Sequence, residues 1–338
     1  MPHLTYLQAI VIGLLQGVTE LFPVSSLGHS VLLPALIGGD WARTLDLSSE
    51  GSPYLAFLVA VHVATAAALV VFYRHDWVRI VRGLATSVQQ RQIATADQRL
   101  GWLLVVATIP VGLAGLALEH TVRTTLGRPV PAAVFLILNG AVLYTVEKLR
   151  SRSSRTGGAH RAHTAPAYAG AEPAITSNPT LRATATTSGS HPLPASDLME
   201  PMEPQGAADG RLAGLGWLSA VAIGAAQILA LLPGISRSGA TIAAGLVRGL
   251  DHDDAARFAF LLATPVIAAA GLFKLPELAG PAGSGILGPV LAGSAAAGVA
   301  AYLALRYLTR YFHTHTLTPF AIYCVLAGSA SLAWLTLA

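Results

Sequence analysis

Two short polar stretches hold the residue types that could do chemistry, and both lie inside otherwise apolar segments. The first, QGVTELFPVSSLGH at residues 16–29, contains a carboxylate, an amide, two serine hydroxyls and an imidazole. The second, PGISRSGAT at residues 233–241, contains an arginine flanked by serines and glycines. An ionised side chain in hydrocarbon is costly unless it is paired or hydrated, so these groups are candidates for a functional site.

The first stretch is expected to be a helix, a break and a second helix. Gln16 and Glu20 are four residues apart, so they share one face of a helix. Pro23 disfavours helical geometry at the preceding residue and interrupts the run. Ser25 and Ser26 then stand where a second helix would begin, suited to capping it. The polar groups would therefore gather around the break.

His29 lies one turn beyond the serines and adds an imidazole to this group. Taken alone, Glu20 could be a carboxylate at a membrane interface and His29 a histidine satisfied within a core. The bunching of several polar groups in fourteen residues favours a site instead. Glu20, Ser26 and His29 are the candidate catalytic residues of this stretch, and Gln16 and Ser25 are candidate substrate contacts.

The second stretch has the composition of an anion site. Arg237 lies in the middle of an apolar segment, and its guanidinium can form two parallel hydrogen bonds to phosphate oxygens. A helix starting near Gly239 would present free N–H groups and a positive dipole end. A snorkelling arginine or a structural ion pair are the alternatives. The residues expected to complete the anion site are Gly234, Ser236, Ser238, Gly239 and Thr241.

The composition is that of a polytopic α-helical membrane protein. Hydrophobic residues make up 53% of the 338 residues, charged residues only 11%, and the mean hydropathy is +0.58. Soluble domains carry about a quarter charged residues. The net charge of +4 comes from scattered basic residues without interleaved aromatics, so no nucleic-acid partner is expected. The single cysteine, Cys324, excludes an intramolecular disulfide.

Eight apolar segments follow one another along the chain. Two of them, 4–37 and 214–250, are broken by proline and small polar residues, so we expect re-entrant helical hairpins. The other six are expected to be full spans, at 53–73, 100–119, 129–148, 255–273, 284–305 and 318–337.

The order of these segments predicts two inverted-topology repeats. Each half, 1–150 and 211–338, has one hairpin followed by three spans, and the hairpin breaks resemble each other (ELFPVSS and ALLPGIS). An odd number of spans per half reverses the second half, so the two breaks would meet near the midplane. Residues 151–210 are rich in Ser, Thr, Ala, Pro and Gly and are expected to be a disordered cytoplasmic linker.

The positive-inside rule predicts the orientation. The loops with more basic residues would be cytoplasmic, which places both termini outside. These residues are Arg74, Arg79, Arg82, Arg91, Arg99, Lys148, Arg150, Arg152, Arg155, Arg306 and Arg310. The opposite loops carry fewer: Arg43, Arg123, Arg128 and Lys274.

The two polar stretches resemble the two signature motifs of the undecaprenyl-diphosphatase family, also called bacitracin-resistance proteins. The segment AARFAFLLATPVIAAAG at 255–271 resembles the part of the family that follows the second motif. The resemblance covers nearly the whole chain except 151–210. It implies hydrolysis of undecaprenyl diphosphate to the monophosphate in the cytoplasmic membrane, at a site open to the outer side, with a divalent cation.

The family's polar residues map onto Gln16, Glu20, Ser26, His29, Ser236, Arg237, Ser238 and Thr241. Position 16 often carries glutamate in the family, and Gln16 removes that carboxylate here. A Mg²⁺ or Ca²⁺ ion would then be held by Glu20, water and the diphosphate oxygens of the substrate. We therefore expect weak metal binding in the absence of substrate.

The resemblance suggests a mechanism with two routes left open. Arg237 and the residues around it would hold the diphosphate, and Ser26 would either attack the terminal phosphorus or position a water that does. Glu20 would act as a base or metal ligand, and His29 would donate to the leaving oxygen or shuttle a proton. The alternative functional class is a lipid flippase or secondary transporter, because these proteins also use inverted repeats with broken helices.

The sequence does not determine the oligomeric state, and a homodimer is possible.

Other polar residues are given structural interpretations. The acidic run at 251–254 precedes an apolar helix and is expected to stabilise its N-terminus. His62 lies within a span and is expected to be a core histidine. His313 and His315 are expected to be solvated in a loop.

Overall fold

The computed structural model describes residues 4–46, 53–162, 205–279 and 286–337, and in these ranges all regular secondary structure is helical. This confirms the all-α class. The helices are α1 (Tyr6–Thr19), α2 (Ser26–Ile37), α3 (Gly39–Thr44), α4 (Pro53–Phe72), α5 (Arg74–Gln90), α6 (Ala96–Leu126), α7 (Pro129–Ala162), α8 (Gln205–Ala213), α9 (Trp217–Ala226), the 3₁₀ helix η1 (Gln227–Leu231), α10 (Arg237–Val247), α11 (His252–Ala279), α12 (Leu287–Tyr311) and α13 (Thr318–Leu337).

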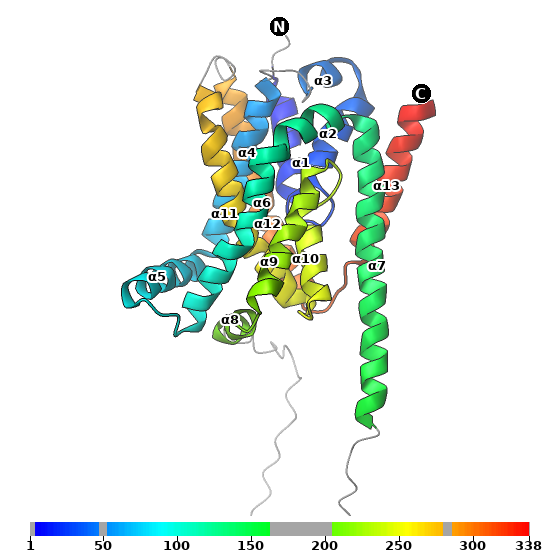
Figure 1. Ribbon diagram of the computed structural model, residues 1–338. Coiled ribbons are helices and arrows are strands. Elements are labelled where there is room, and N and C mark those ends of the chain that lie inside the picture. The colour runs from blue at the N-terminus through cyan, green and yellow to red at the C-terminus, as the bar shows by residue number, and fades with distance from the viewer. Residues whose placement is uncertain (1–3, 47–52, 163–204, 280–285, 338) are drawn as a thin grey trace, which may run out of the picture.

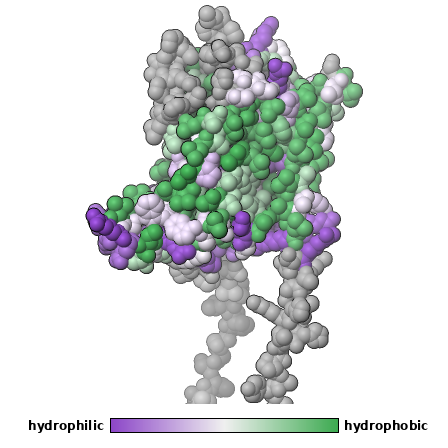
Figure 2. Space-filling model, in the orientation of Figure 1, coloured by the Kyte–Doolittle hydropathy of each residue, from purple (hydrophilic) through white to green (hydrophobic). Residues whose placement is uncertain are grey.

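Six of these helices are long and apolar enough to cross a membrane: α4, α6, α7, α11, α12 and α13. They coincide with the six spans expected from the sequence, so the protein is a multi-pass membrane protein. Hydrophobic residues cover the middle of the bundle surface, and hydrophilic residues gather at its lower end (Figure 2). This distribution is what a bilayer requires of the surface that it contacts.

Both segments expected to be broken are broken at the expected residues. In the first, α1 ends before Glu20 and α2 begins at Ser26, whose predecessor Ser25 has a φ of 70°. In the second, α9 continues as η1, and α10 begins at Arg237. Gly234 in this second break has a φ of 115°, which favours glycine. The re-entrant placement of these hairpins in a bilayer stays a prediction.

Each broken segment packs closely on a span from the other half of the chain. A Cβ atom at Gly13 of α1 would lie 2.1 Å from the carbonyl oxygen of Gly293 in α12. A Cβ atom at Gly224 of α9 would lie 1.9 Å from the carbonyl oxygen of Ala107 in α6. Small residues allow helix backbones to approach this closely inside membranes. Two related halves would pack in this way, with the broken segment of each half against a span of the other. The repeat interpretation itself stays a prediction.

The two chain termini lie at one end of the bundle, and α5, α8 and the end of α7 lie at the other (Figure 1).

Two boundaries differ from expectation. Residues 74–90, expected to be loop, form α5. The expected linker 151–210 is helical at both ends, because α7 runs to Ala162 and α8 starts at Gln205. No proline follows Pro131 until Pro166, so nothing stops α7 at the membrane surface. Residues 163–204 lie outside the described ranges.

An ionic cluster ties α5 and α8 to the start of α11. Arg257 donates to Asp76 Oδ1 at 2.9 Å and to Asp209 Oδ1 at 2.8 Å. Arg79 contacts the same two carboxylates. Asp253 and Asp254 lie in the first turn of α11, as expected for helix-start acids. This end of the bundle is therefore fixed by charge pairing rather than by apolar packing alone.

Candidate functional site

The two helix breaks meet, and the side-chain amide of Asn139 bridges them. Asn139 of α7 donates from Nδ2 to the carbonyl of Pro23 at 3.0 Å and accepts at Oδ1 from the N–H of Ser236 at 3.1 Å. Ser25 Oγ accepts from the N–H of Gly234 at 3.2 Å. A Cβ atom at Gly28 would lie 2.9 Å from Gly234 Cα, so the backbones are in direct contact. Residues more than 200 positions apart are thus placed side by side.

Replacing Asn139 with leucine is expected to lower both the melting temperature and the rate of phosphate release. The change leaves the N–H of Ser236 without a partner and the carbonyl of Pro23 with only the distant Cys324 thiol at 3.9 Å. An unsatisfied buried group costs about 1–3 kcal/mol. Thermal unfolding in detergent measures the loss. Thr145→Val on the exposed part of the same helix is the matched control, and an unchanged melting temperature for Asn139→Leu would refute the bridging role.

Glu20 is the centre of the polar cluster. Its side chain is 4% exposed and lies just beyond the C-terminus of α1. Gln16 donates from Nε2 to Oε2 at 2.8 Å, Ser26 donates its hydroxyl to the same oxygen, and Arg237 donates to Oε1. The expected encounter of a carboxylate from one break with a guanidinium from the other is therefore present. Three donors from separate residues therefore converge on one buried carboxylate.

The hydroxyl groups of the second break are only partly directed at this centre. Ser236 caps α10 by accepting from Gly239 N–H at 3.1 Å, and its hydroxyl lies 3.1 Å from that of Ser238. Ser238 donates weakly to the carbonyls of Glu20 and Phe22, each at 3.4 Å. Thr241 is different, because its hydroxyl donates to the Arg237 carbonyl of its own helix at 2.7 Å. The geometry thus favours the two serines over Thr241 as contacts for an anion.

His29 has both ring nitrogens engaged by protein groups. Nδ1 lies 2.7 Å from the carbonyl of Ser25, and because a carbonyl only accepts, this nitrogen carries a proton. Nε2 lies 2.8 Å from the hydroxyl of Tyr323 in α13, and the two rings are stacked at 5.7 Å. In the neutral imidazole Nε2 therefore accepts from Tyr323. A direct transfer from His29 to a leaving oxygen would first have to break this hydrogen bond.

Replacing Tyr323 with phenylalanine is expected to lower kcat by about 10- to 100-fold with little change in KM. Proton transfer by a positioned group is worth about 10²–10⁴-fold, and the tyrosine would act through the orientation of His29. Steady-state phosphate release measures both constants. Tyr302→Phe on α12 is the matched control. A rise in KM with unchanged kcat would assign Tyr323 to substrate binding instead.

His62 of α4 belongs to the site, although it was expected to be only a core histidine. Its Nδ1 is satisfied by the carbonyl of Leu58 at 2.7 Å, but its Nε2 lies 3.4 Å from Glu20 Oε2. Asn139 and Tyr323 were also not foreseen. All three are single polar residues in apolar spans, which is the signal that could have found them. Because no motif surrounds these three residues, the sequence does not show which side of its helix faces the site.

The oxygen atoms of Glu20 and its neighbour Gln16 are compatible with a weakly held divalent cation. Gln16 Oε1 is buried and has no hydrogen-bond partner, which leaves an oxygen of the type that Mg²⁺ and Ca²⁺ prefer. Within the described residues there is no group of three or more His, Cys, Asp or Glu side chains that could hold a metal ion. Glu20 and Gln16 could supply two oxygen ligands, with the rest left to substrate and water.

Fold and site together define a multi-pass membrane protein in which two broken helices bring a carboxylate, a guanidinium and serine hydroxyls into contact. The family model described as bacitracin resistance protein BacA matches residues 9–330. The chain belongs to this family.

Full-length relatives agree with this assignment. The chain is 59% identical over 335 residues to an undecaprenyl-diphosphatase of Mycolicibacterium paratuberculosis, covering 99% of each chain. It is 56% identical over 345 residues to undecaprenyl-diphosphatase 2 of Frankia alni, covering 97% of each. It is 40% identical over 334 residues to an undecaprenyl-diphosphatase of Gluconacetobacter diazotrophicus, covering 97% of this chain and 96% of the relative.

Proposed function

We propose that this protein is an integral membrane phosphatase that hydrolyses undecaprenyl diphosphate to undecaprenyl phosphate and inorganic phosphate, which recycles the lipid carrier for cell-wall synthesis. The observation that carries the proposal is the contact between Glu20 and Arg237 across the two breaks. Relatives that match the chain over its full length and bear the name undecaprenyl-diphosphatase support it.

Arg237 is assigned to binding the diphosphate. Its side chain is 19% exposed, more than that of Glu20, so an entering phosphate can reach the guanidinium first. The guanidinium would exchange its carboxylate partner for phosphate oxygens, with Ser236 and Ser238 beside it. Neutralising charge on these oxygens and positioning them supply most of the catalysis in phosphoryl transfer.

Release of Glu20 from Arg237 would leave the carboxylate as a base next to Ser26. In one route the Ser26 oxygen bonds to the terminal phosphorus, its proton passes to Glu20, and the bond to the bridging oxygen breaks. Water then hydrolyses the phosphoserine. In the other route Ser26 positions a water that attacks directly, and the proton again passes to Glu20. Trapping a phosphoserine at Ser26 supports the first route, and oxygen-exchange patterns that exclude a covalent intermediate support the second.

A divalent cation, Mg²⁺ or Ca²⁺, is proposed to bind together with the substrate. It would neutralise charge on the diphosphate oxygens when bound. With one carboxylate and one amide oxygen from the protein, we expect binding to the lipid-free protein to be weak. Isothermal titration of the lipid-free protein with each ion measures this affinity, and tight binding would contradict the proposed sharing of ligands with substrate.

The proposed orientation places both termini outside and residues 151–210 in the cytoplasm. It rests on the basic residues at the end of the bundle that carries α5. Labelling of single cysteines introduced near each end in intact cells tests it.

The decisive experiment is phosphate release from a polyprenyl diphosphate by the purified protein in detergent. Detergent removes any transmembrane gradient, so a secondary transporter would show no turnover. Release that depends on Glu20 and Arg237 supports the phosphatase. Gradient-driven uptake into vesicles without hydrolysis would support the alternative, a lipid-phosphate flippase or secondary transporter.

A further inference from the structure

An open hollow of about 560 Å³ lies at the end of α12, on the side of the bundle opposite the two termini. It is lined by Leu303, Arg306, Tyr307, Arg310, Tyr311 and His315. The catalytic side chains described above are not among these residues. The hollow therefore needs an explanation of its own.

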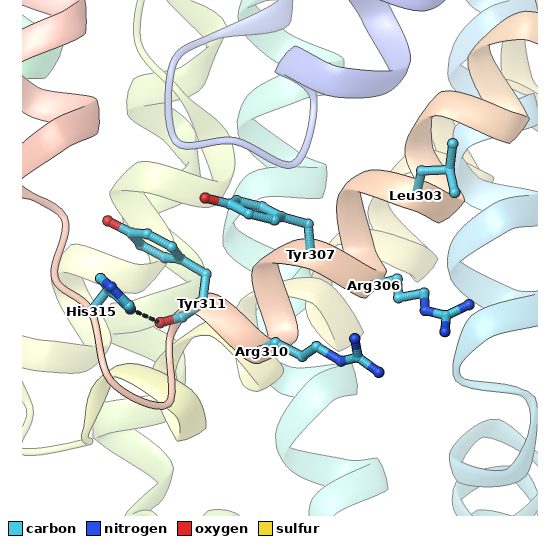
Figure 3. A pocket seen from close by; sticks show the side chains of 6 residues that line it. All are labelled: Leu303, Arg306, Tyr307, Arg310, Tyr311 and His315. Atoms are coloured by element: carbon cyan, nitrogen blue, oxygen red, sulfur yellow. Dashed lines mark hydrogen bonds between the residues drawn. The ribbon is translucent and has the colours of Figure 1, made fainter.

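The two arginines of the hollow have no partner among the side chains that the structure describes. Neither the Arg306 nor the Arg310 guanidinium has a hydrogen bond or ion pair with any described part of the chain, and both side chains are exposed. They are four residues apart, so they extend to the same side of α12 (Figure 3). Like charges at this spacing repel each other. The helix dipole favours a cation at Arg310 in the last turn, but it does not account for the pair.

The same face of α12 is apolar in the direction of the membrane. Leu291, Val299 and Leu303 are exposed by 61%, 61% and 59%, and they precede Arg306 and Arg310 at helical spacing. A hydrocarbon chain lying along these residues would end at the two guanidinium groups. A stripe of apolar side chains that ends at two cationic side chains matches the shape of a phospholipid with an anionic headgroup.

Stacked aromatic rings form the other wall of the hollow. Tyr307 and Tyr311 stack at 5.7 Å, and Tyr311 stacks on His315 at 4.6 Å. Tyr307 also stacks on Phe22, which lies in the first helix break, at 5.9 Å. In Figure 3 the rings point to the side of α12 away from the guanidinium groups. Tyrosines at this depth are typical of the membrane–water interface, where headgroups lie.

From these observations we infer that the hollow at Arg306 and Arg310 is a binding site for an anionic phospholipid. The lipid phosphate would lie between the two guanidinium groups, each donating to its oxygens, and one acyl chain would follow Leu303 and Val299 along α12. None of the side chains assigned to the substrate lines the hollow, so the site is distinct from the one that takes the substrate, and it does not depend on the proposed phosphatase activity.

Native mass spectrometry of the full-length protein in a neutral detergent tests the inference. The protein is titrated with phosphatidylglycerol and, separately, with phosphatidylcholine of the same acyl chains. We expect tighter binding of phosphatidylglycerol. The variant Arg306→Gln/Arg310→Gln is expected to lose about thirtyfold in that affinity, the factor that corresponds to about 1 kcal/mol for each arginine near a lipid surface.

A matched control removes the same charge elsewhere. Arg82 and Arg91 are exposed residues of α5 and of its C-terminus, at the same end of the bundle. Arg82→Gln/Arg91→Gln is expected to keep the affinity within about twofold, because it leaves the hollow intact. Arg306→Lys/Arg310→Lys keeps the charge without the planar fork and is expected to bind between the wild type and the glutamine variant.

Three outcomes would overturn the inference. One is wild-type affinity for phosphatidylglycerol in the Arg306→Gln/Arg310→Gln variant. Another is an equal loss in the α5 control, which would indicate attraction by overall charge. The third is displacement of the lipid by millimolar inorganic phosphate, which would mean that the hollow takes a free anion. Thermal unfolding of each variant in detergent serves as the check that the protein is folded.

Discussion

Replacing Arg237 with alanine is expected to lower phosphate release from undecaprenyl diphosphate by about 10³-fold or more. An arginine that stabilises the charge of a transferring phosphoryl group is worth about 10³–10⁵-fold in kcat. Arg237 is placed for this role by the N-terminus of α10, and its guanidinium is the cation held against Glu20. Phosphate release in detergent is the measurement, with both kcat and KM determined.

The control for this variant lies on the same helix. Arg248 is the exposed C-cap of α10, and Arg248→Ala is expected to keep near-normal turnover. Because Arg237→Ala leaves a buried carboxylate without its cation, the folded state has to be checked by thermal unfolding. Arg237→Lys keeps the charge but not the fork, and it is expected to recover part of the rate. Turnover by a folded Arg237→Ala variant within about tenfold of wild type would refute the assignment.

The parts of the fold that follow from local chemistry could be predicted from the sequence. Apolar runs of the right length gave the six spans, and Pro23 and Pro233 with their neighbouring serines marked both breaks. Residues 74–90 form the amphipathic helix α5 rather than the predicted loop, because basic residues at a membrane surface suit an amphipathic helix as well as a loop. The length of α7 was missed because a composition suited to a linker also permits a helix beyond the membrane.

The candidate site was predictable where its residues form a motif and not where they stand alone. Glu20 and Arg237 were expected to meet, and they do. The partners Asn139, His62 and Tyr323 come from separate spans, and which face of a span points inward depends on packing between helices. The hydrogen bond from Tyr323 to His29 joins residues 294 positions apart, a separation at which no local pattern applies.

Replacing Glu20 with glutamine is expected to lower phosphate release by about 10²–10⁴-fold, because the variant cannot take up a proton from Ser26 or from water. The amide is nearly isosteric and can still accept from the Ser26 hydroxyl. Arg237, however, loses its counter-charge, and breaking one member of a buried pair costs about 3–5 kcal/mol. The single variant should therefore also unfold at a lower temperature, so activity alone does not separate a catalytic role from a structural one.

The double variant Glu20→Gln/Arg237→Gln makes that separation. With both charges gone, the two amides can bond each other, and replacement of a whole buried pair by neutral groups is often neutral for stability. We expect the melting temperature to return towards that of the wild type while phosphate release stays as low as in the single variants. A structural ion pair would behave differently, because activity would then recover together with stability. Measured side by side, the two quantities decide whether the contact between the helix breaks holds the protein together or performs its chemistry.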